Sequence, residues 1–160
     1  MSDSHNTTKT IAVPLTVSTT AYSANDVVGG LITLNVPSGI VRRVKLTDDD
    51  NEGAAMTLYL FDAQPTIIAN DAAFTPTISD DDKLVAILTL DTTGYFTLNS
   101  NKVGWFKGDD ARIGLDIDYE AKQNKLFAYL VCTGTPTYTA ATDLKLHFTL
   151  WLDYPRLANV

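Results

Sequence analysis

Cysteine, basic residues and long apolar runs are all scarce in this chain. Cys132 is the only cysteine, so no disulfide can form within the chain. The fold must therefore rest on its core alone, which suits assembly in a reducing cytoplasm. No segment approaches the roughly 20 apolar residues that span a bilayer, and residues 1–10 lack the apolar stretch of a signal peptide. These absences argue against a disulfide-stapled secreted domain and against a membrane partner.

Positive charge is in deficit. The chain has 12 lysines and arginines against 19 aspartates and glutamates, for a formal net charge of −7. Such a chain repels phosphate backbones. Arg42, Arg43 and Lys45 form the only basic cluster along the sequence, and it is too small to reverse that repulsion. We therefore expect no nucleic-acid partner.

Helical periodicity is also nearly absent, and alternation of apolar and polar residues takes its place. The segment 113–119 alternates in this way, and so does the segment 144–153. A period of two indicates half-buried antiparallel strands. About eight such runs, separated by turns, predict an all-β protein: an antiparallel β-sandwich or barrel, jelly-roll-like in its strand number. We expect one such domain over residues 11–160 after a flexible N-terminal arm at residues 1–10.

Proline and glycine refine this outline. Pro14 predicts an edge strand or a bulge in the first run, because proline cannot donate to a ladder. Gly29 and Gly30 predict a bulge in the second. Residues 62–83 form the longest irregular stretch, where Ser79 is a candidate cap for one helical turn. The expected strands lie at 11–17, 28–36, 40–46, 54–61, 84–90, 94–98, 112–120, 125–132 and 144–153, with 104–106 in a loop or short strand.

Two of these runs are apolar on both faces, namely 84–90 and 125–132. A strand of a simple sandwich should present one face to water. Either the irregular segment 62–83 covers the second face, or that face is a subunit interface, as large apolar patches on soluble proteins often are. The candidate interface residues are Val85, Ile87, Phe127, Tyr129 and Val131.

Trp151 has the outward parity of its run, together with Lys145, His147 and Thr149. An exposed indole can stack on a sugar or anchor a protein interface. Since no second aromatic residue shares that face of the run, packing or an interface is favoured. Trp151 is therefore a candidate exposed anchor.

The acidic residues form no recognisable ion site. Asp48, Asp50 and Glu52 alternate as at the start of an EF-hand calcium loop. The glutamate needed at the twelfth position is replaced by Tyr59, within an expected strand, which argues against an EF-hand. A solvated acidic turn is favoured, and a weak calcium site shared with other loops remains the alternative.

No catalytic constellation is visible either. The adjacent carboxylates of residues 80–82 diverge, and neither His5 nor His147 has a nearby histidine or cysteine with which to bind a metal. No Gly-x-Ser-x-Gly stretch occurs. Gly29-Gly30 lacks the lysine and hydroxyl residue of a phosphate loop. We predict a protein that is not an enzyme, with no catalytic residues, no cofactor and no metal.

One resemblance is specific enough to name. The segment Thr20-Ala21-Tyr22-Ser23-Ala24-Asn25-Asp26-Val27-Val28-Gly29-Gly30, running into an apolar strand, resembles small virion structural proteins of tailed bacteriophages. Leu60–Pro65, Asp71–Phe74 and Ser79–Asp82 occur in similar order in such proteins. The resemblance covers most of residues 20–90, and its motifs are structural rather than catalytic.

The resemblance implies a capsid decoration, or cement, protein. Such a protein is made in the bacterial host cytoplasm, sits on the virion capsid surface as a homotrimer, and clamps the major capsid protein. Two alternatives stay open: a carbohydrate-binding β-sandwich that stacks sugars on Trp151 and Trp105, and a tail or neck component of the same fold. Head and tail proteins both use β-sandwiches and fold does not dictate role, so the sequence does not distinguish decoration from the tail or neck alternative.

Overall fold

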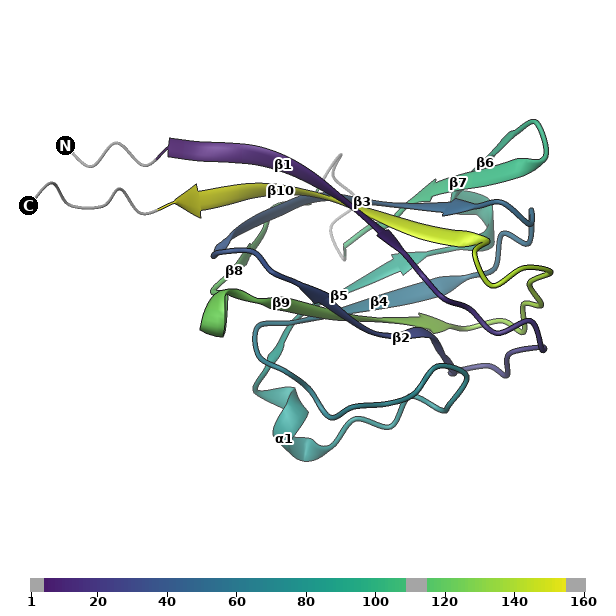
Figure 1. The fold of residues 1–160 in the computed structure, drawn as a ribbon, viewed down its shortest axis with the longest axis horizontal. Coiled ribbons are helices and arrows are strands. Elements are labelled where there is room, and N and C mark those ends of the chain that lie inside the picture. The colour runs from purple at the N-terminus through teal and green to yellow at the C-terminus, as the bar shows by residue number, and fades with distance from the viewer. Residues whose placement is uncertain (1–4, 109–114, 155–160) are drawn as a thin grey trace, which may run out of the picture.

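The computed structural model describes residues 5–108 and 115–154, which form two antiparallel sheets stacked as a sandwich (Figure 1). The larger sheet has the order β1-β10-β3-β7-β6, with β8 also paired to β3, and the smaller has the order β2-β9-β4-β5. The strands are β1 (His5–Pro14), β2 (Val27–Leu34), β3 (Gly39–Asp48), β4 (Met56–Phe61), β5 (Leu84–Leu90), β6 (Tyr95–Leu98), β7 (Asn101–Trp105), β8 (Ile117–Tyr119), β9 (Leu126–Cys132) and β10 (Leu144–Tyr154). Short helical turns lie at α1 (Ile78–Asp81), η1 (Thr92–Gly94) and η2 (Lys122–Asn124). The predicted all-β sandwich is confirmed.

The core lies between the two sheets and is filled by every second residue of each strand. On β10 the inward residues are Leu144, Leu146, Phe148, Leu150 and Leu152, all essentially inaccessible to water. They meet the inward residues of the smaller sheet, such as Leu58 and Leu130. Burying each such side chain stabilises the fold by about 1.5–3 kcal/mol. The alternation of apolar and polar residues along the sequence therefore accounts for the packing of the two sheets into a sandwich.

The predicted flexible arm needs correction. From His5 onward the chain is strand β1, which pairs with β10 over its whole length. The sequence pattern did not predict this strand, because no apolar residue occupies an inward position before Ile11. What orders the segment is the backbone ladder along the edge of the long strand β10. β1 is an edge strand that ends at Pro14, as proline predicted. Residues 1–4 of the predicted arm lie outside the described residues.

Two other local predictions have different outcomes. The bulge at Gly29-Gly30 is confirmed: the register of β2 shifts between Val28 and Ile32, and both glycines have positive φ. The helical turn exists, but Ser79 lies inside it and the cap is Thr77, whose amide donates to Asp80 Oδ2 at 2.8 Å.

The run predicted at 112–120 is strand only at Ile117–Tyr119. The rest of that run up to residue 114 lies outside the described residues.

The segment 62–83 runs beneath the smaller sheet and covers its outer face (Figure 1). A second apolar cluster forms there, separate from the main core. It joins Val27, Phe61, Phe127, Tyr129 and Val131 of the sheet to Ile68 and Phe74 of the segment. The molecule thus has a third layer on one side only, and the outer face of the larger sheet has no comparable cover within the described chain.

Candidate interaction surface

The second face of β9, a candidate subunit interface, is buried within the molecule. Phe127, Tyr129 and Val131 are at most 4% exposed because the segment 62–83 packs over them. The structure therefore realises the other alternative, in which that segment covers the strand. These three side chains cannot reach a partner unless the segment is displaced, so they do not form an exposed interface.

The Tyr129 hydroxyl fastens this cover to the sheet. It accepts a hydrogen bond from the Ile68 amide at 2.9 Å and donates one to the Thr66 carbonyl at 2.7 Å. Burial raises the pKa of Tyr129 above its ordinary value, and the hydrogen bond from Ile68 only partly offsets the rise. The hydroxyl therefore stays protonated and serves as both donor and acceptor.

The residues that carry the phage resemblance serve the same purpose at the other end of the segment. Asn70 Oδ1 accepts from the Tyr22 hydroxyl at 2.7 Å and from the Gly29 amide at 2.8 Å. The Ser23 amide donates to Asp26 Oδ2 at 2.8 Å. These motifs hold the segment 62–83 against the bulge of β2. Their role in this chain is to build the scaffold.

The remaining candidate interface residues lie on β5, an edge of the smaller sheet. Val85 is partly buried against the main core. Ile87 is 44% exposed, and Leu84 of the same strand is also exposed. Ile87 thus remains available to a partner, and Val85 contributes mainly to the fold.

In the acidic turn after β3, the buried carboxylate binds backbone amides of the turn itself. Asp48 is buried, and its carboxylate accepts the amides of Asp50 at 3.0 Å and Gly53 at 2.8 Å. Burial raises the pKa of Asp48, and these two bonds only partly oppose the rise. Asp50 in turn binds the hydroxyl and amide of Thr139. These carboxylates close a turn and tie it to the 133–143 loop.

Asp80 is another buried carboxylate with a structural role. It accepts from the amides of Thr66 at 3.0 Å and Thr77 at 2.8 Å, and from Lys83 Nζ at 3.0 Å. Burial alone would raise the pKa of Asp80, but the hydrogen bonds from Thr77, Lys83 and Thr66 outweigh it and hold the pKa well below its usual value. This charge anchors α1 to the start of the segment 62–83.

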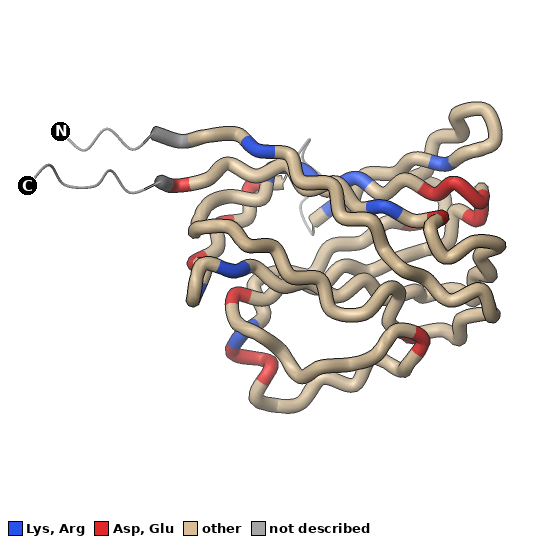
Figure 2. The backbone as a smooth tube through the Cα atoms, viewed as in Figure 1, with Lys and Arg blue, Asp and Glu red and all other residues tan. Residues whose placement is uncertain are grey.

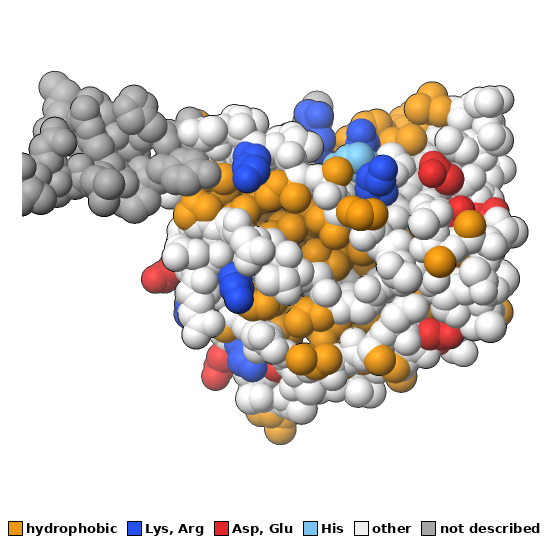
Figure 3. All heavy atoms as spheres, in the orientation of Figure 1, with side chains coloured by type: hydrophobic (Ala, Val, Ile, Leu, Met, Phe, Trp, Pro, Cys, Tyr) orange, Lys and Arg blue, Asp and Glu red, His pale blue; other side chains and the backbone are white. Residues whose placement is uncertain are grey.

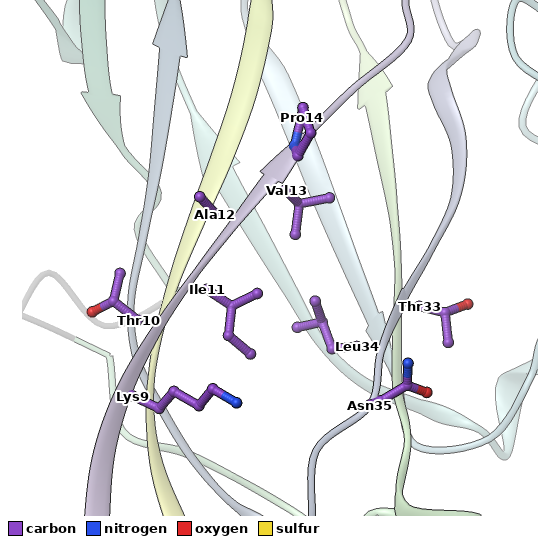
Figure 4. Close-up of a pocket in the computed structure, with 9 residues that line it drawn as sticks. All are labelled: Lys9, Thr10, Ile11, Ala12, Val13, Pro14, Thr33, Leu34 and Asn35. Carbon is purple, nitrogen blue, oxygen red and sulfur yellow. The ribbon is translucent and has the colours of Figure 1, made fainter.

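A groove of about 560 Å³ separates the edge strands β1 and β2. Ile11, Val13 and Leu34 point toward one another across it, while Lys9 reaches toward Asn35 at one end (Figure 4). An apolar strip follows this opening between the two sheets (Figure 3). A lysine on the inward face and a proline are common protections of a free sheet edge, and β1 has both in Lys9 and Pro14.

The outer face of the larger sheet gathers residues that are far apart in the sequence. Lys45 on β3 pairs with His147 on β10 to one side and with Trp105 on β7 to the other. Directly paired residues project from the same face of a sheet. The neighbours of these three residues along each strand are buried, so the three side chains point away from the core. We call this surface the outer sheet face; its members are Ile40, Arg42, Arg43, Lys45, Phe96, Leu98, Val103, Trp105, Lys145, His147, Thr149 and Trp151.

Trp151 lies on this face and is 36% exposed. The Arg42 guanidinium carbon sits 5.3 Å from the centroid of its ring, within the range of a cation–π contact. Arg42 also pairs with Asp116 at 2.9 Å. One side of the indole is thus engaged by a cation that is itself held in place.

Trp105, 38% exposed, supplies the second aromatic residue that the sequence of β10 alone did not offer. Its ring meets Phe96 edge-on, with centroids 6.1 Å apart. Phe96 is 65% exposed and belongs to β6, the far edge of the sheet. Figure 3 shows apolar side chains at this end of the molecule.

Cations lie among these aromatic residues. Within the described part of the chain, Arg43, Lys45 and Lys145 form no ion pair. Basic side chains surround a histidine at the upper margin of Figure 3, and basic positions follow the larger sheet in Figure 2, whereas acids gather in turns at the ends of the molecule. Burial, Lys45 and Lys145 all lower the pKa of His147. The outer sheet face is therefore locally positive on an acidic protein.

The described residues contain neither a cluster of metal-binding side chains nor a membrane-spanning helix. No group of three or more histidine, cysteine, aspartate or glutamate side chains is placed to hold a metal ion in residues 5–108 and 115–154. Among the helices in those ranges, none has the length and apolarity needed to cross a bilayer.

Sequence reasoning found the members of the outer sheet face only separately. It noted Arg42, Arg43 and Lys45 as one cluster and both tryptophans as isolated residues. The order β10-β3-β7, which brings them together, is a long-range property of the sheet. The outward parity of each run was the one available signal, and it was correct for Trp151.

Comparisons with known proteins add little. No family model matches this chain, and no curated protein matches it. Among solved structures, it is similar to a chain of the native virion of Kashmir bee virus at neutral pH, with 16% identity, over 91% of this chain and 68% of that chain, at a TM-score of 0.27. Likeness at this level carries no argument about what this chain does or binds.

Proposed function

We propose that this chain is a non-enzymatic structural protein of a tailed-phage virion that binds the outside of the capsid lattice and stabilises it. The observation that carries the proposal is the outer sheet face, where Trp105, Trp151 and Phe96 are exposed beside cations such as Lys45 and Lys145 that form no ion pair among the described residues. Aromatic residues and arginine are the types that dominate the energetics of protein interfaces. The phage resemblance of residues 20–90 supports the same class of protein.

The mechanism would be binding alone. A protein that binds the assembled, expanded lattice and no other state stabilises it by mass action, by about 2.7 kcal/mol at a free concentration of 100 Kd. A rigid sandwich with an exposed face suits this task, because little conformational entropy is lost on docking. In this scheme the protein is made in the host cytoplasm and joins the capsid surface.

Self-association into a trimer is the second part of the proposal. Ile87 and Leu84 offer exposed apolar surface on the edge strand β5, away from the outer sheet face. Val85 supports that strand from the core side. A trimer built through β5 would leave the larger sheet free for the capsid.

The test is to locate the protein on particles of the source phage with gold-labelled antibody. Label distributed regularly over the head is the expected result. Label confined to the tail would overturn the decoration role in favour of the tail component. Label absent from every particle would overturn a virion role altogether.

A further inference from the structure

We propose that the outer sheet face is a docking surface for an acidic protein surface, one rich in aspartate and glutamate side chains. The inference rests on the proposed function in one respect: it assigns that acidic surface to the capsid lattice. The juxtaposition that carries it is the row Trp105, Lys45 and His147, which three different strands supply.

Charge complementarity points to the partner. Arg43, Lys45 and Lys145 have no ionic partner among the described residues, although acids outnumber basic residues in the chain as a whole. Described acids occur only at the margins of this face: Asp116 and Asp118 at β8, and Asp153 at the end of β10. Asp116 is already engaged by Arg42. Among the described residues, therefore, no acid compensates the cations at the centre of the face.

The aromatic residues favour a protein over a sugar chain. A sugar needs the open face of an aromatic ring, but Arg42 lies over Trp151, and Phe96 meets Trp105 edge-on. Ile40, Leu98 and Val103 add aliphatic surface around them. An apolar and aromatic centre flanked by charges is the composition of a protein–protein interface.

Carboxylates on the partner would form charge-assisted hydrogen bonds with these cations and steer the encounter. Burial, together with Lys45 and Lys145, lowers the pKa of His147, and carboxylates of the partner would raise it again. Binding should accordingly weaken as ionic strength rises, because exposed charge pairs are screened.

The chain carries a built-in reporter for the test. Trp105 and Trp151 are its only tryptophans, and both lie on the outer sheet face. Tryptophan fluorescence of the full chain would be titrated with a ten-residue polyglutamate peptide, and its co-sedimentation with purified capsids would be measured in parallel. The test variant is Lys45→Glu with Lys145→Glu. The control is Lys9→Glu with Lys125→Glu, which makes the same change in net charge away from this face.

The expected result is that the test variant loses about tenfold or more in affinity for the peptide and for capsids, while the control binds as the wild type does. Equal binding by the test variant and the wild type would overturn the inference. So would a fluorescence response to a neutral oligosaccharide or to duplex DNA with none to polyglutamate.

The two proposals fail separately. If the wild type does not co-sediment with capsids but binds polyglutamate through Lys45 and Lys145, the capsid role is wrong and the acidic docking surface stands. If the wild type and the test variant both co-sediment equally well, the capsid role stands and this surface is not the one used.

Discussion

At the scale of single residues, two buried polar groups govern the segment 62–83: Asp80 within the segment and the Tyr129 hydroxyl beneath it. Asp80 and the Tyr129 hydroxyl both hold backbone amides of that segment. A buried polar group contributes modestly when it is paired and costs much more when its partner is removed. The segment has few apolar residues in contact with the sheet, chiefly Ile68 and Phe74, so the bonds of Tyr129 help to hold it there. The bonds of Asp80 to Thr66 and Thr77 fix the fold of the segment itself.

The first prediction concerns Asp80. Asp80→Asn keeps the shape but replaces a carboxylate oxygen by an amide that cannot accept, and it should lower the free energy of unfolding by about 1–3 kcal/mol at pH 7. The pKa of Asp80 in the folded protein lies well below the usual value of an aspartate, so ionised Asp80 stabilises the fold at neutral pH. This contribution is lost as the pH falls through the folded pKa. Denaturant unfolding at pH 7 and pH 3 should show the difference shrinking.

Asp82→Asn is the matched control for this change, because Asp82 is exposed and loses the same charge. It should change stability by no more than about 0.5 kcal/mol. A loss as large as that of Asp80→Asn would mean that net charge, and not the buried bonds of Asp80, is responsible.

The second prediction compares two buried tyrosines. Tyr129→Phe leaves the Ile68 amide without its acceptor and should cost about 1–3 kcal/mol. The Tyr138 hydroxyl is buried with no hydrogen-bond partner in the described part of the chain, and burial raises its pKa. Tyr138→Phe should therefore be neutral or stabilising. Thermal unfolding of both variants, with hydrogen exchange at Ile68, gives the answer; faster exchange in Tyr138→Phe alone would reverse the assignment.

At the scale of elements, the sequence predicted the strands that show local alternation of apolar and polar residues. It missed the features that depend on pairing between distant parts of the chain. The runs that became β3, β4, β5, β9 and β10 were all identified, because each buries alternate residues in one core. The first half of β1 was missed because its inward residues before Ile11 are polar. Whether the segment 62–83 covers β9 could not be decided, since its contacts with Phe127 and Tyr129 join residues about 60 positions apart.

The third prediction tests β1 itself. The Leu15 amide donates to the Leu144 carbonyl at 3.0 Å, so odd-numbered residues of β1 donate toward β10 and even-numbered ones face the free edge. Thr7→Pro should remove a ladder bond and cost about 1 kcal/mol, whereas Thr8→Pro should cost little, as Pro14 does at the same parity. Chemical denaturation of the two variants provides the comparison. Equal stability of both would return residues 5–10 to the predicted flexible arm.

At the scale of the whole molecule, the two sheets differ in what covers them. The smaller sheet is closed by the segment 62–83, and the residues that carry the phage resemblance hold that closure in place. The larger sheet presents its aromatic and basic residues outward. In the proposed function, one molecule would hold a second copy through the edge strand β5 and a different partner through the outer sheet face.

The last prediction addresses self-association through β5. Ile87→Asp places a charge on the exposed side of the edge strand, where desolvating it in a subunit contact would be costly. The variant should be monomeric under conditions in which the wild type is a trimer, as measured by sedimentation equilibrium. Ile67→Asp is the matched control, because Ile67 is exposed in the segment 62–83 and undergoes the same chemical change. If Ile87→Asp remains a trimer, the contact lies elsewhere; if both variants dissociate, the contact extends from β5 across that segment.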